Sequence, residues 1–348
     1  MEATPPPPSL RQIGEFGLID RLRAVLSGSP GQAPLVDLGD DAVAWDQAAA
    51  VLVASTDAMV EEIHFDLRLT GWHDLGWKAM AVNLSDLAAM GAAPAVALVT
   101  LGLRAETSPR DVEALYRGMR ALADPARCRI VGGDTVAVRA AQVLSLTVIG
   151  TVPAGEGQTL LRRQHGHPGD RLAVTGWLGG AAAGLHALRH PGSAPSALTE
   201  ALATAYRRPQ PRLAAGLALR RAGVRCAMDI SDGLMADLHK LCAASGCGAQ
   251  VEAARLPSHP AAVEAFPQQA LAWAAGGGDD YELLFAAPPP IMELAGRELA
   301  ALGVACAEIG TLTAAAGDVQ LVDAGGHPVT LPAQGWDHFA PPSNAGAT

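Results

Sequence analysis

Six short stretches of this chain place aspartate directly after an apolar run or in a turn beside one. They read DLGDDAV (37–43), STDAMV (55–60), NLSDLAAMG (83–91), VGGDTV (131–136), DISDGL (229–234) and GGGDDYELLF (276–285). Residues at strand ends in α/β folds converge on a cleft. Carboxylates that converge cannot all ionise without a counter-charge. The pattern therefore indicates a fold that gathers these turns around a positively charged group or ion.

Strand-like apolar runs alternate loosely with helical patterns, which predicts an α/β (α+β) fold. The successive elements in the first half are expected at 13–26, 50–60, 72–91, 95–103, 108–126, 128–136 and 141–152. A length of 348 residues is about twice that of a typical domain, so two domains are expected. Hydrophobic residues make up 49% of the chain, which is enough to build a core in each.

The turn-rich stretch PAGEGQTLLRRQHGHPGD (153–170) is the predicted boundary between the domains. The Pro-rich start and the polar end of the chain are typical of disordered segments. The expected organisation is a disordered N-terminus at 1–12, an N-terminal domain at 13–152, a C-terminal domain at 153–340 and a disordered tail at 341–348.

Composition excludes several classes of function. The net charge of −10 argues against a general nucleic-acid surface or an anionic-membrane surface, since both need a basic face. No run of 18 or more apolar residues is free of charges and breakers, so no membrane span is expected. The five cysteines contain no C-x-x-C pair, which argues against a zinc knuckle or a disulfide framework and favours a reducing, cytoplasmic location.

The acidic turns favour divalent cations as their counter-charge. Only two lysines occur, Lys78 and Lys240, and the acidic turns contain no arginine. Asp86 lies in the last turn of its predicted helix, where the helix dipole disfavours an anion by roughly 0.3–1 kcal/mol unless a cation is bound. Oxygen ligands from aspartate, serine and threonine favour Mg²⁺ over zinc, and protein-bound Mg²⁺ is usually shared with substrate phosphates.

Each acidic turn also has an ordinary structural interpretation. An aspartate in a glycine turn is most often a solvated turn residue, and Asp or Ser before a helix is most often an N-cap. Six such turns, each beside an apolar run, favour a shared metal–phosphate site instead. Two common nucleotide sites are excluded, because neither lysine lies in a G-x-x-x-x-G-K-[ST] motif and no G-x-G-x-x-G opens a helix after a strand.

The order of the motifs resembles the thiamine-monophosphate kinase family, within the superfamily of aminoimidazole ribonucleotide synthetase and selenophosphate synthetase. The matching stretches are GEFGLIDRL, LGDDAV, STDAMVEEIHF, KAMAVNLSDLAAMGAAP, VGGDT, DISDGLMADL, GDDYELLF and GWDHF, which run from about residue 13 to 339. The resemblance implies two α/β domains, with the N-terminal sheets of two subunits pairing in a homodimer. It also implies ATP and thiamine monophosphate as substrates, direct in-line phosphoryl transfer giving thiamine diphosphate, and several Mg²⁺ ions.

The resemblance also assigns roles to individual residues. The positions that match the family's metal ligands are Asp41, Ser55, Thr56, Asp57, Asp86, Asp134, Asp229 and Asp232. Of these, Asp57, Asp86 and Asp134 are expected to serve catalysis most directly. Those that match its ATP contacts are Gly133, Asp134, Arg163 and Ser231, where Arg162 is the alternative to Arg163. Those that match its thiamine-phosphate contacts are His64, Glu282 and Trp336.

One departure from the family pattern and three alternatives remain. Family members often carry Asn before the motif histidine, whereas this chain has Ile63. The first alternative is another superfamily enzyme, although the first 30 residues lack the Cys or selenocysteine with a nearby Lys that selenophosphate synthetase usually carries. The second is a non-catalytic nucleotide- or thiamine-phosphate-binding protein. The third is a carbamoyl-transfer maturation protein, for which a C-terminal Cys would be expected.

Overall fold

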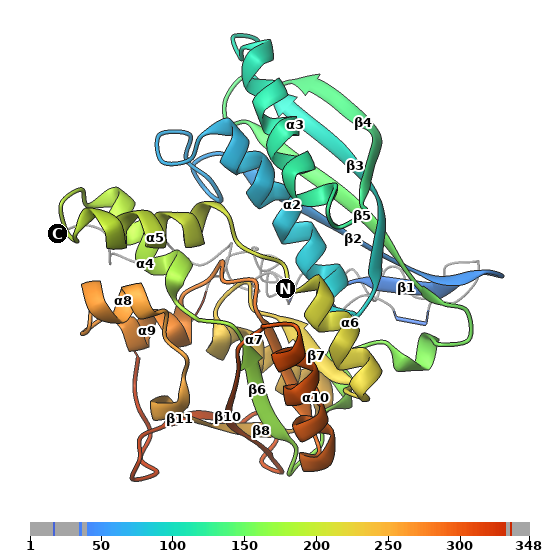
Figure 1. The fold of residues 1–348 in the computed structure, drawn as a ribbon, viewed down its shortest axis with the longest axis vertical. Coiled ribbons are helices and arrows are strands. Elements are labelled where there is room, and N and C mark those ends of the chain that lie inside the picture. Colours follow the sequence, from blue (N-terminus) through green and yellow to red (C-terminus); the bar gives the residue numbers. More distant parts are fainter. Residues whose placement is uncertain (1–16, 18–34, 37–39, 332–334, 336–348) are drawn as a thin grey trace, which may run out of the picture.

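The computed structural model describes residues 17, 35–36, 40–331 and 335, which form two mixed sheets with helices packed against them (Figure 1). The predicted disordered ends, the element expected at 13–26 except for residue 17, and Trp336 lie outside these residues. The expected two-domain α/β architecture is confirmed. In the described part of the chain, no helix has both the length and the apolar character needed to cross a membrane.

The first sheet has the strand order β1-β2-β5-β3-β4. Its strands are β1 Val43–Asp46, β2 Ala50–Val60, β3 Ala93–Leu103, β4 Arg129–Ala137 and β5 Val143–Pro153. All neighbours pair antiparallel except β3 and β4, which are parallel. Buried and more exposed residues alternate along β5, because one face of the sheet packs on a core and the other does not.

Two helices, α2 Trp72–Ala89 and α3 Pro109–Ala123, cover the packed face of this sheet (Figure 1). Ser108 caps α3 by accepting a hydrogen bond from the Arg110 amide, and Pro109 opens its first turn as the sequence predicts. Helix α2 ends just before Gly91, which has φ +65°, a conformation that favours glycine. Asp86 therefore lies in the last turn of α2, as expected.

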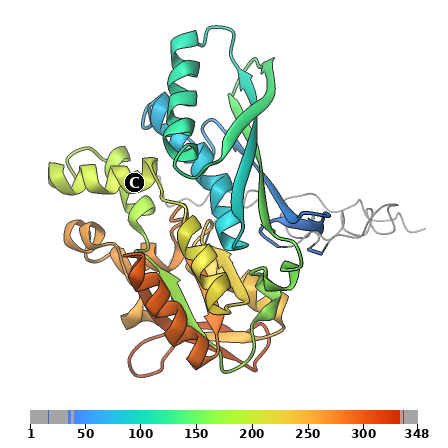
Figure 2. The same cartoon turned by 45° about the vertical axis from the view of Figure 1, so that its right-hand side comes forward.

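The opposite face of the first sheet is not covered by any helix in the described residues. Large apolar side chains on β3 and β4 are exposed there or at the sheet's edge, with exposed fractions of 41% for Leu98, 51% for Val131 and 49% for Val136. Figure 2 shows the twisted sheet with α2 and α3 on one side only. Exposed apolar surface of this kind is typical of an interface.

The second sheet has the strand order β11-β8-β10-β6-β9-β7. Its strands are β6 Arg171–Thr175, β7 Cys226–Asp229, β8 Gly248–Glu252, β9 Leu283–Ala287, β10 Cys306–Thr313 and β11 Val319–Val322. Separate apolar clusters include residues of this sheet: one contains α7 Leu234–Ser245, and the other contains α6 Leu213–Ala222 and α10 Pro289–Ala301.

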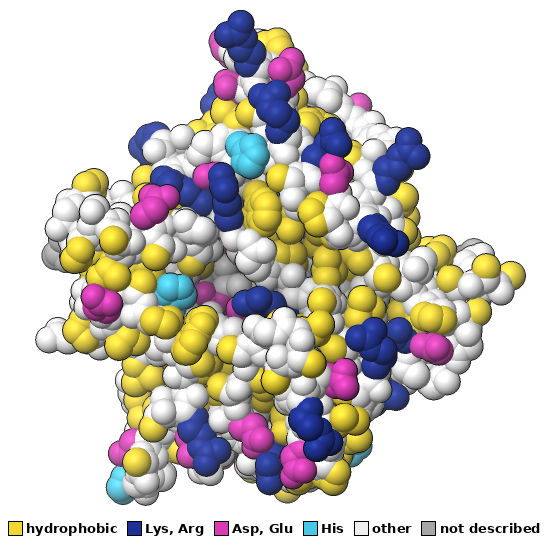
Figure 3. Space-filling model, viewed as in Figure 1, with side chains coloured by type: hydrophobic (Ala, Val, Ile, Leu, Met, Phe, Trp, Pro, Cys, Tyr) yellow, Lys and Arg dark blue, Asp and Glu magenta, His cyan; other side chains and the backbone are white. Residues whose placement is uncertain are grey.

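Further helices pack together beside this sheet (Figure 1). They are α4 Gly180–Arg189, α5 Ser196–Arg207, α8 Pro260–Ala265 and α9 Ala270–Gly276. Short 3₁₀ helices are η1 Gly157–Thr159, η2 Arg163–His165 and η3 Ala253–Arg255. On the face in Figure 3, basic and acidic side chains are interspersed, without a single extended basic patch.

Helix α2 joins the two sheets. Its C-terminal end packs against α6, where a Cβ atom on Gly216 would lie only 2.0 Å from the carbonyl oxygen of Ala88. Glycine is therefore required for this close approach. In Figure 2 the lower end of α2 lies beside α6. The acidic turn at the end of α2 is consequently held against the second domain.

Candidate functional site

Three aspartates from distant parts of the chain meet where α2 reaches the second sheet. Carboxylate oxygens of Asp41, Asp86 and Asp229 all lie within 4.8 Å of one another. Asp41 precedes β1, Asp86 is on α2 and Asp229 ends β7, so both domains contribute. Asp41 is 8% exposed and Asp229 is 4% exposed. The structure thus brings together three of the predicted metal ligands, and we call this group the acidic triad.

Serine hydroxyls orient two members of the acidic triad. Ser55 on β2 donates a hydrogen bond to Oδ2 of Asp86 at 2.5 Å, and Ser85 on α2 donates to Oδ2 of Asp229 at 2.6 Å. The side chain of Asn83 accepts a hydrogen bond from the Asp57 amide at 3.2 Å. Ser85 and Asn83 were not singled out from the sequence, although both lie in the NLSD motif and differ from Asp86 by one and three positions.

The acidic triad is electrostatically strained without a cation. Burial, reinforced by Asp57, Asp229 and Asp41, raises the pKa of Asp86 well above that of an ordinary aspartate. Burial and then Asp41 raise the pKa of Asp229 in the same way. Oδ2 of Asp41 is buried and has no hydrogen-bond partner within the described part of the chain. A buried, unpartnered carboxylate oxygen beside two others fits a hard divalent cation such as Mg²⁺.

Arginine borders the triad on one side. Arg163, in η2, donates through Nε to Oδ1 of Asp41 at 3.2 Å, and its Nη2 contacts the same oxygen. The neighbouring Arg162 has its Nε 4.0 Å from Asp40, and that nitrogen is buried without a hydrogen-bond partner among the described residues. Burial, followed by the charge of Asp41, raises the pKa of Asp40 to about 7.

The acidic motifs contain no lysine or arginine, but lysine and arginine from elsewhere in the chain supply part of the counter-charge that the sequence pattern assigns to divalent cations. Both lysines are ion-paired to such turns: Lys78 lies 2.8 Å from Asp279, and Lys240 lies 2.5 Å from Asp232. Arg163 pairs with Asp41 in the same way. Lys78 and Arg163 come from segments far from their partners in sequence, so motif spacing could not reveal these pairs.

The DISDG turn is held by a buried aspartate on the helix that follows. Asp237 is fully buried, and it accepts the amide protons of Ser231 at 2.9 Å and Asp232 at 3.0 Å. Lys240 also bonds to Asp237, at 2.7 Å. Burial raises the pKa of Asp237 to about 6 despite this cation. Asp232 is thus ion-paired at the margin of the site, and it is not a member of the triad.

The carboxylates of the GDDYE turn have three different sets of partners. Asp279 faces Lys78, and Asp280 accepts the amide proton of Gly179 at 2.7 Å, at the start of α4. Burial raises the pKa of Asp280 well above its ordinary value. Glu282, a predicted substrate contact, is 4% exposed and is paired with Arg212 through bonds of 2.5 and 2.6 Å. Thr175 donates a further hydrogen bond to Glu282 at 2.6 Å.

The side chains of Thr56 and Asp134 lie on the other face of the first sheet. Ser55 and Asp57 alternate with Thr56 along β2, and the Thr56 hydroxyl bonds to the Leu146 carbonyl at 2.9 Å. Cross-strand partners share a face, and the row Ala58, Ser145, Thr100 and Asp134 runs across the outer, uncovered face. The structure therefore does not bring these two side chains to the acidic triad of the same chain.

Gly133 lies directly before Asp134 in β4, where this strand approaches β3 closely. It has φ +151°, and a Cβ atom there would lie 1.7 Å from the Val99 carbonyl oxygen. Only glycine can occupy this position, because any side chain would collide with the neighbouring strand. Backbone packing thus explains the glycine before Asp134 in the VGGD motif. Because Gly133 has no side chain, its predicted nucleotide contact could be made only by its peptide group.

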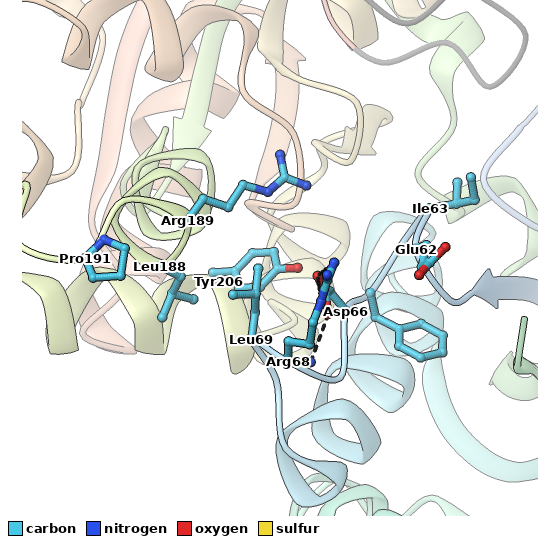
Figure 4. A pocket seen from close by; sticks show the side chains of 10 residues that line it. Glu62, Ile63, Asp66, Arg68, Leu69, Leu188, Arg189, Pro191 and Tyr206 are labelled. Atoms are coloured by element: carbon cyan, nitrogen blue, oxygen red, sulfur yellow. Dashed lines mark hydrogen bonds and ion pairs between the residues drawn. The ribbon is translucent and has the colours of Figure 1, made fainter. Parts of the chain in front are cut away.

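A cavity of about 360 Å³ lies between the loop after β2 and helices α4 and α5 (Figure 4). Its walls include the apolar or aromatic side chains of Ile63, Phe65, Leu69, Leu188 and Tyr206, and the charged side chains of Glu62, Asp66, Arg68 and Arg189. His64 is flanked by two wall residues, while its own Nδ1 accepts the Val60 amide proton at 3.0 Å. Trp336 lies outside the described residues.

Comparison with known proteins identifies the family that this chain resembles. Residues 39–152 match the family model of the AIR synthase related protein N-terminal domain, and residues 167–322 match its C-terminal domain. A thiamine-monophosphate kinase of Escherichia coli O157:H7 is 38% identical over 332 residues, which cover 94% of this chain and 99% of that protein.

Two solved structures of similar proteins also span nearly the whole chain. One, designated AaThiL complexed with AMPPCP and TMP, has a TM-score of 0.82 at 28% identity, covering 96% of this chain and 99% of its own. The other, a thiamine-monophosphate kinase from Stenotrophomonas maltophilia K279a, has a TM-score of 0.74 at 36% identity and covers 90% and 98%.

Proposed function

The chain belongs to the thiamine-monophosphate kinase family of AIR synthase-related proteins, and we propose that it transfers the γ-phosphoryl group of ATP to thiamine monophosphate. The products are thiamine diphosphate and ADP. The observation that carries this proposal is the acidic triad, because it joins both domains at a buried point with an unpartnered carboxylate oxygen. A divalent cation held at such a site would neutralise phosphate charge.

The residues proposed to hold Mg²⁺ are the acidic triad together with Asp57, Ser55, Asp232, Thr56 and Asp134. Bound Mg²⁺ would supply charge neutralisation on the phosphates of donor and acceptor. Arg163, next to Asp41, and the peptide groups of Gly133 and Ser231 are proposed to bind the nucleotide. The attacking group is a phosphate oxygen that is ionised at neutral pH, so the chain needs no strong general base. Its residues act by aligning the two substrates in line.

We propose that the chain works as a homodimer paired through the outer face of the first sheet. This face carries the exposed apolar side chains of Leu98 and Val136, together with Thr56 and Asp134. Asp134 is a predicted metal and ATP ligand, yet its side chain lies on the face away from the acidic triad of its own chain. Pairing these faces would bring Asp134 to the subunit interface, and we propose that it serves the site of the partner subunit from there.

The organic half of thiamine monophosphate is assigned to the cavity beside His64. Its volume of about 360 Å³ lies within the usual range for small-molecule pockets, and its walls combine apolar residues and two aromatic rings with four charged side chains. We expect Leu188→Trp to fill the cavity and raise KM for thiamine monophosphate roughly tenfold, with KM for ATP unchanged. Leu302→Trp, at an exposed position far along the chain, is the control. Unchanged KM values for both substrates in Leu188→Trp would exclude this cavity.

Without a bound metal, the free energy of unfolding should decrease as pH rises, and metal binding should counteract this decrease. Asp86, Asp229, Asp40 and Asp237 have pKa values raised by burial, to about 7 for Asp40 and about 6 for Asp237. The folded protein therefore binds more protons than the unfolded chain above the ordinary aspartate pKa of about 4. Its free energy of unfolding falls as pH rises through these raised values. We expect EDTA-treated protein to melt at a lower temperature at about pH 8 than at about pH 5.5.

Added Mg²⁺ should raise the melting temperature more at the higher pH, since the cation replaces the protons. Thermal melts at both pH values, with and without Mg²⁺, measure this directly. A Mg²⁺ effect that is absent, or larger at the lower pH, would contradict the assignment of the triad as a metal site. Asp86→Asn is the matched variant, and its Mg²⁺ effect should be smaller.

The proposed function is tested by ³¹P NMR of the purified protein with ATP, Mg²⁺ and thiamine monophosphate, beside a sample containing EDTA. The expected result is the growth of a diphosphate doublet pair together with ADP, abolished by EDTA. ADP and free phosphate without thiamine diphosphate would indicate a synthetase of the same superfamily. Metal-dependent ATP binding without turnover would indicate a non-catalytic binding protein.

A further inference from the structure

Lys78 is a buried cation for which the proposed reaction has no direct use. It lies on α2 and is only 1% exposed. A buried ammonium group is costly unless it is paired and hydrogen-bonded. The same helix carries Ser85 and Asp86. Asp86 is eight residues after Lys78, which corresponds to about 12 Å along the helix axis. Lys78 therefore lies about two helical turns from Asp86 on the same helix.

The partners of Lys78 all belong to the second domain. Its Nζ lies 2.8 Å from Oδ2 of Asp279 and 4.0 Å from the centroid of the Tyr206 ring. Oδ1 of Asp279 accepts a hydrogen bond from the Tyr281 hydroxyl at 2.9 Å. The ammonium group thus has an anion and an aromatic face as partners, and the Lys78 side chain is 2% exposed while that of Asp279 is 36% exposed. Such a pair is sensitive to the loss of either partner.

The Asp279 turn has an unusual backbone that needs support. Asp279 has φ +70° and Tyr281 has φ +51°, and neither residue is glycine. Left-handed conformations of this kind are unfavourable for residues other than glycine and persist only when the surroundings hold them. The amides of Asp279 and Tyr281 donate to the carbonyls of Ser231 and Ile230 at 2.8 and 2.9 Å. The turn is therefore attached directly to the segment that follows Asp229.

We infer that Lys78 is a positioning residue of the active site. Its ion pair attaches the Asp279 turn to α2, and the backbone hydrogen bonds of this turn hold the segment after β7. Asp86 and Asp229 come from these same two elements, α2 and β7, so the pair sets the spacing of the two carboxylates across the domain boundary. This inference rests on the proposed function only in assigning Mg²⁺ to the acidic triad.

The test compares Lys78→Met with Arg208→Met. Arg208 makes another ion pair between α2 and the second domain, with Asp74 at 2.6 Å, but its side chain is 46% exposed and its partner is on α2 and not in the Asp279 turn. An exposed pair of this kind contributes little. Hydrogen exchange followed by mass spectrometry reports the segments 229–233 and 277–282, and kinase assays report the half-saturating Mg²⁺ concentration and KM for thiamine monophosphate.

We expect Lys78→Met to exchange roughly tenfold faster in both segments than wild type, while α2 itself stays protected. The half-saturating Mg²⁺ concentration should rise roughly 10- to 100-fold, as for other residues that orient metal ligands. KM for thiamine monophosphate should stay within about twofold, and Arg208→Met should match wild type in every measure. Wild-type exchange in these segments, or a wild-type Mg²⁺ response with only a lower melting temperature, would overturn the inference.

The test remains decisive if the Lys78→Met variant does not fold or if the wild-type protein has no kinase activity. If Lys78→Met does not fold, Asp279→Asn takes its place, because it keeps the shape and removes the charge of the partner. The same direction of change is expected in a smaller amount, and wild-type behaviour would overturn the inference. If the wild-type protein has no kinase activity, the proposed function fails, and the hydrogen-exchange comparison alone decides whether Lys78 positions these segments.

Discussion

Asp86→Asn is expected to lower kcat by roughly 10³-fold or more. A metal ligand can stabilise the transition state by several kcal/mol, and a loss of that size corresponds to this decrease in rate. Asp86 is central to the acidic triad, since the pKa of its carboxyl group is raised by burial and then by Asp57, Asp229 and Asp41. Steady-state assays at saturating Mg²⁺ measure the effect.

The same substitution should not unfold the protein. Asparagine keeps the shape of the side chain, and its carbonyl oxygen can still accept the hydrogen bond from Ser55. Removing one buried carboxylate also relieves repulsion, so the metal-free melting temperature should stay equal or rise. Asp124→Asn, which removes only an exposed pair with Arg120, is the control and should keep full activity. A kcat near that of wild type in Asp86→Asn would remove Asp86 from the catalytic site.

Mixed dimers of Asp134→Asn and Asp229→Asn are expected to recover activity that neither variant has alone. If Asp134 acts in the site of the partner subunit, a heterodimer of the two variants contains one intact site and one site with both defects. Random assembly makes half of the dimers heterodimers, so activity should return to about a quarter of the wild-type value. Two differently tagged subunits, co-expressed and purified through both tags, would raise this to about a half.

The matched control mixes Asp86→Asn with Asp229→Asn. Both residues belong to the triad of one chain, so every site in that heterodimer carries a defect and no activity should return. Asp134→Asn mixed with Asp229→Asn that stays as inactive as this control would show that Asp134 does not act across the interface. The outer face of the first sheet would then need another explanation.

Much of the site could be predicted because its ligands sit in short motifs beside apolar runs. Asp41, Asp86 and Asp229 were grouped from such motifs, and their carboxylates meet in the structure. The strand period of two could also have separated Thr56 from Ser55 and Asp57, since alternate residues of β2 face opposite ways. The face of Asp134 could not be predicted, because β3 and β4 pair with a register shift between Ala97 and Leu98.

The cations of the site illustrate what a single sequence conceals. Lys78 and Asp279 are separated by 201 positions, and Arg163 and Asp41 by 122. Their pairing depends on how the two domains pack at α2 and α6, which no local pattern encodes. The acidic turns therefore fall into two groups. Asp279 and Asp232 are paired with lysine, so that Mg²⁺ at Asp232 would have to displace Lys240. Asp86 and Asp229 accept hydrogen bonds from serine hydroxyls and could bind a metal without displacing a lysine.

The most direct test of the metal site is a crystal structure of the protein with Mn²⁺ and a non-hydrolysable ATP analogue. Anomalous scattering would locate the ions. We predict at least one peak at a bonding distance of about 2.0–2.3 Å from oxygens of Asp41, Asp86 and Asp229, with the nucleotide phosphates on the same ion. Ions bound only elsewhere, with the triad carboxylates still hydrogen-bonded as in the metal-free protein, would contradict the account.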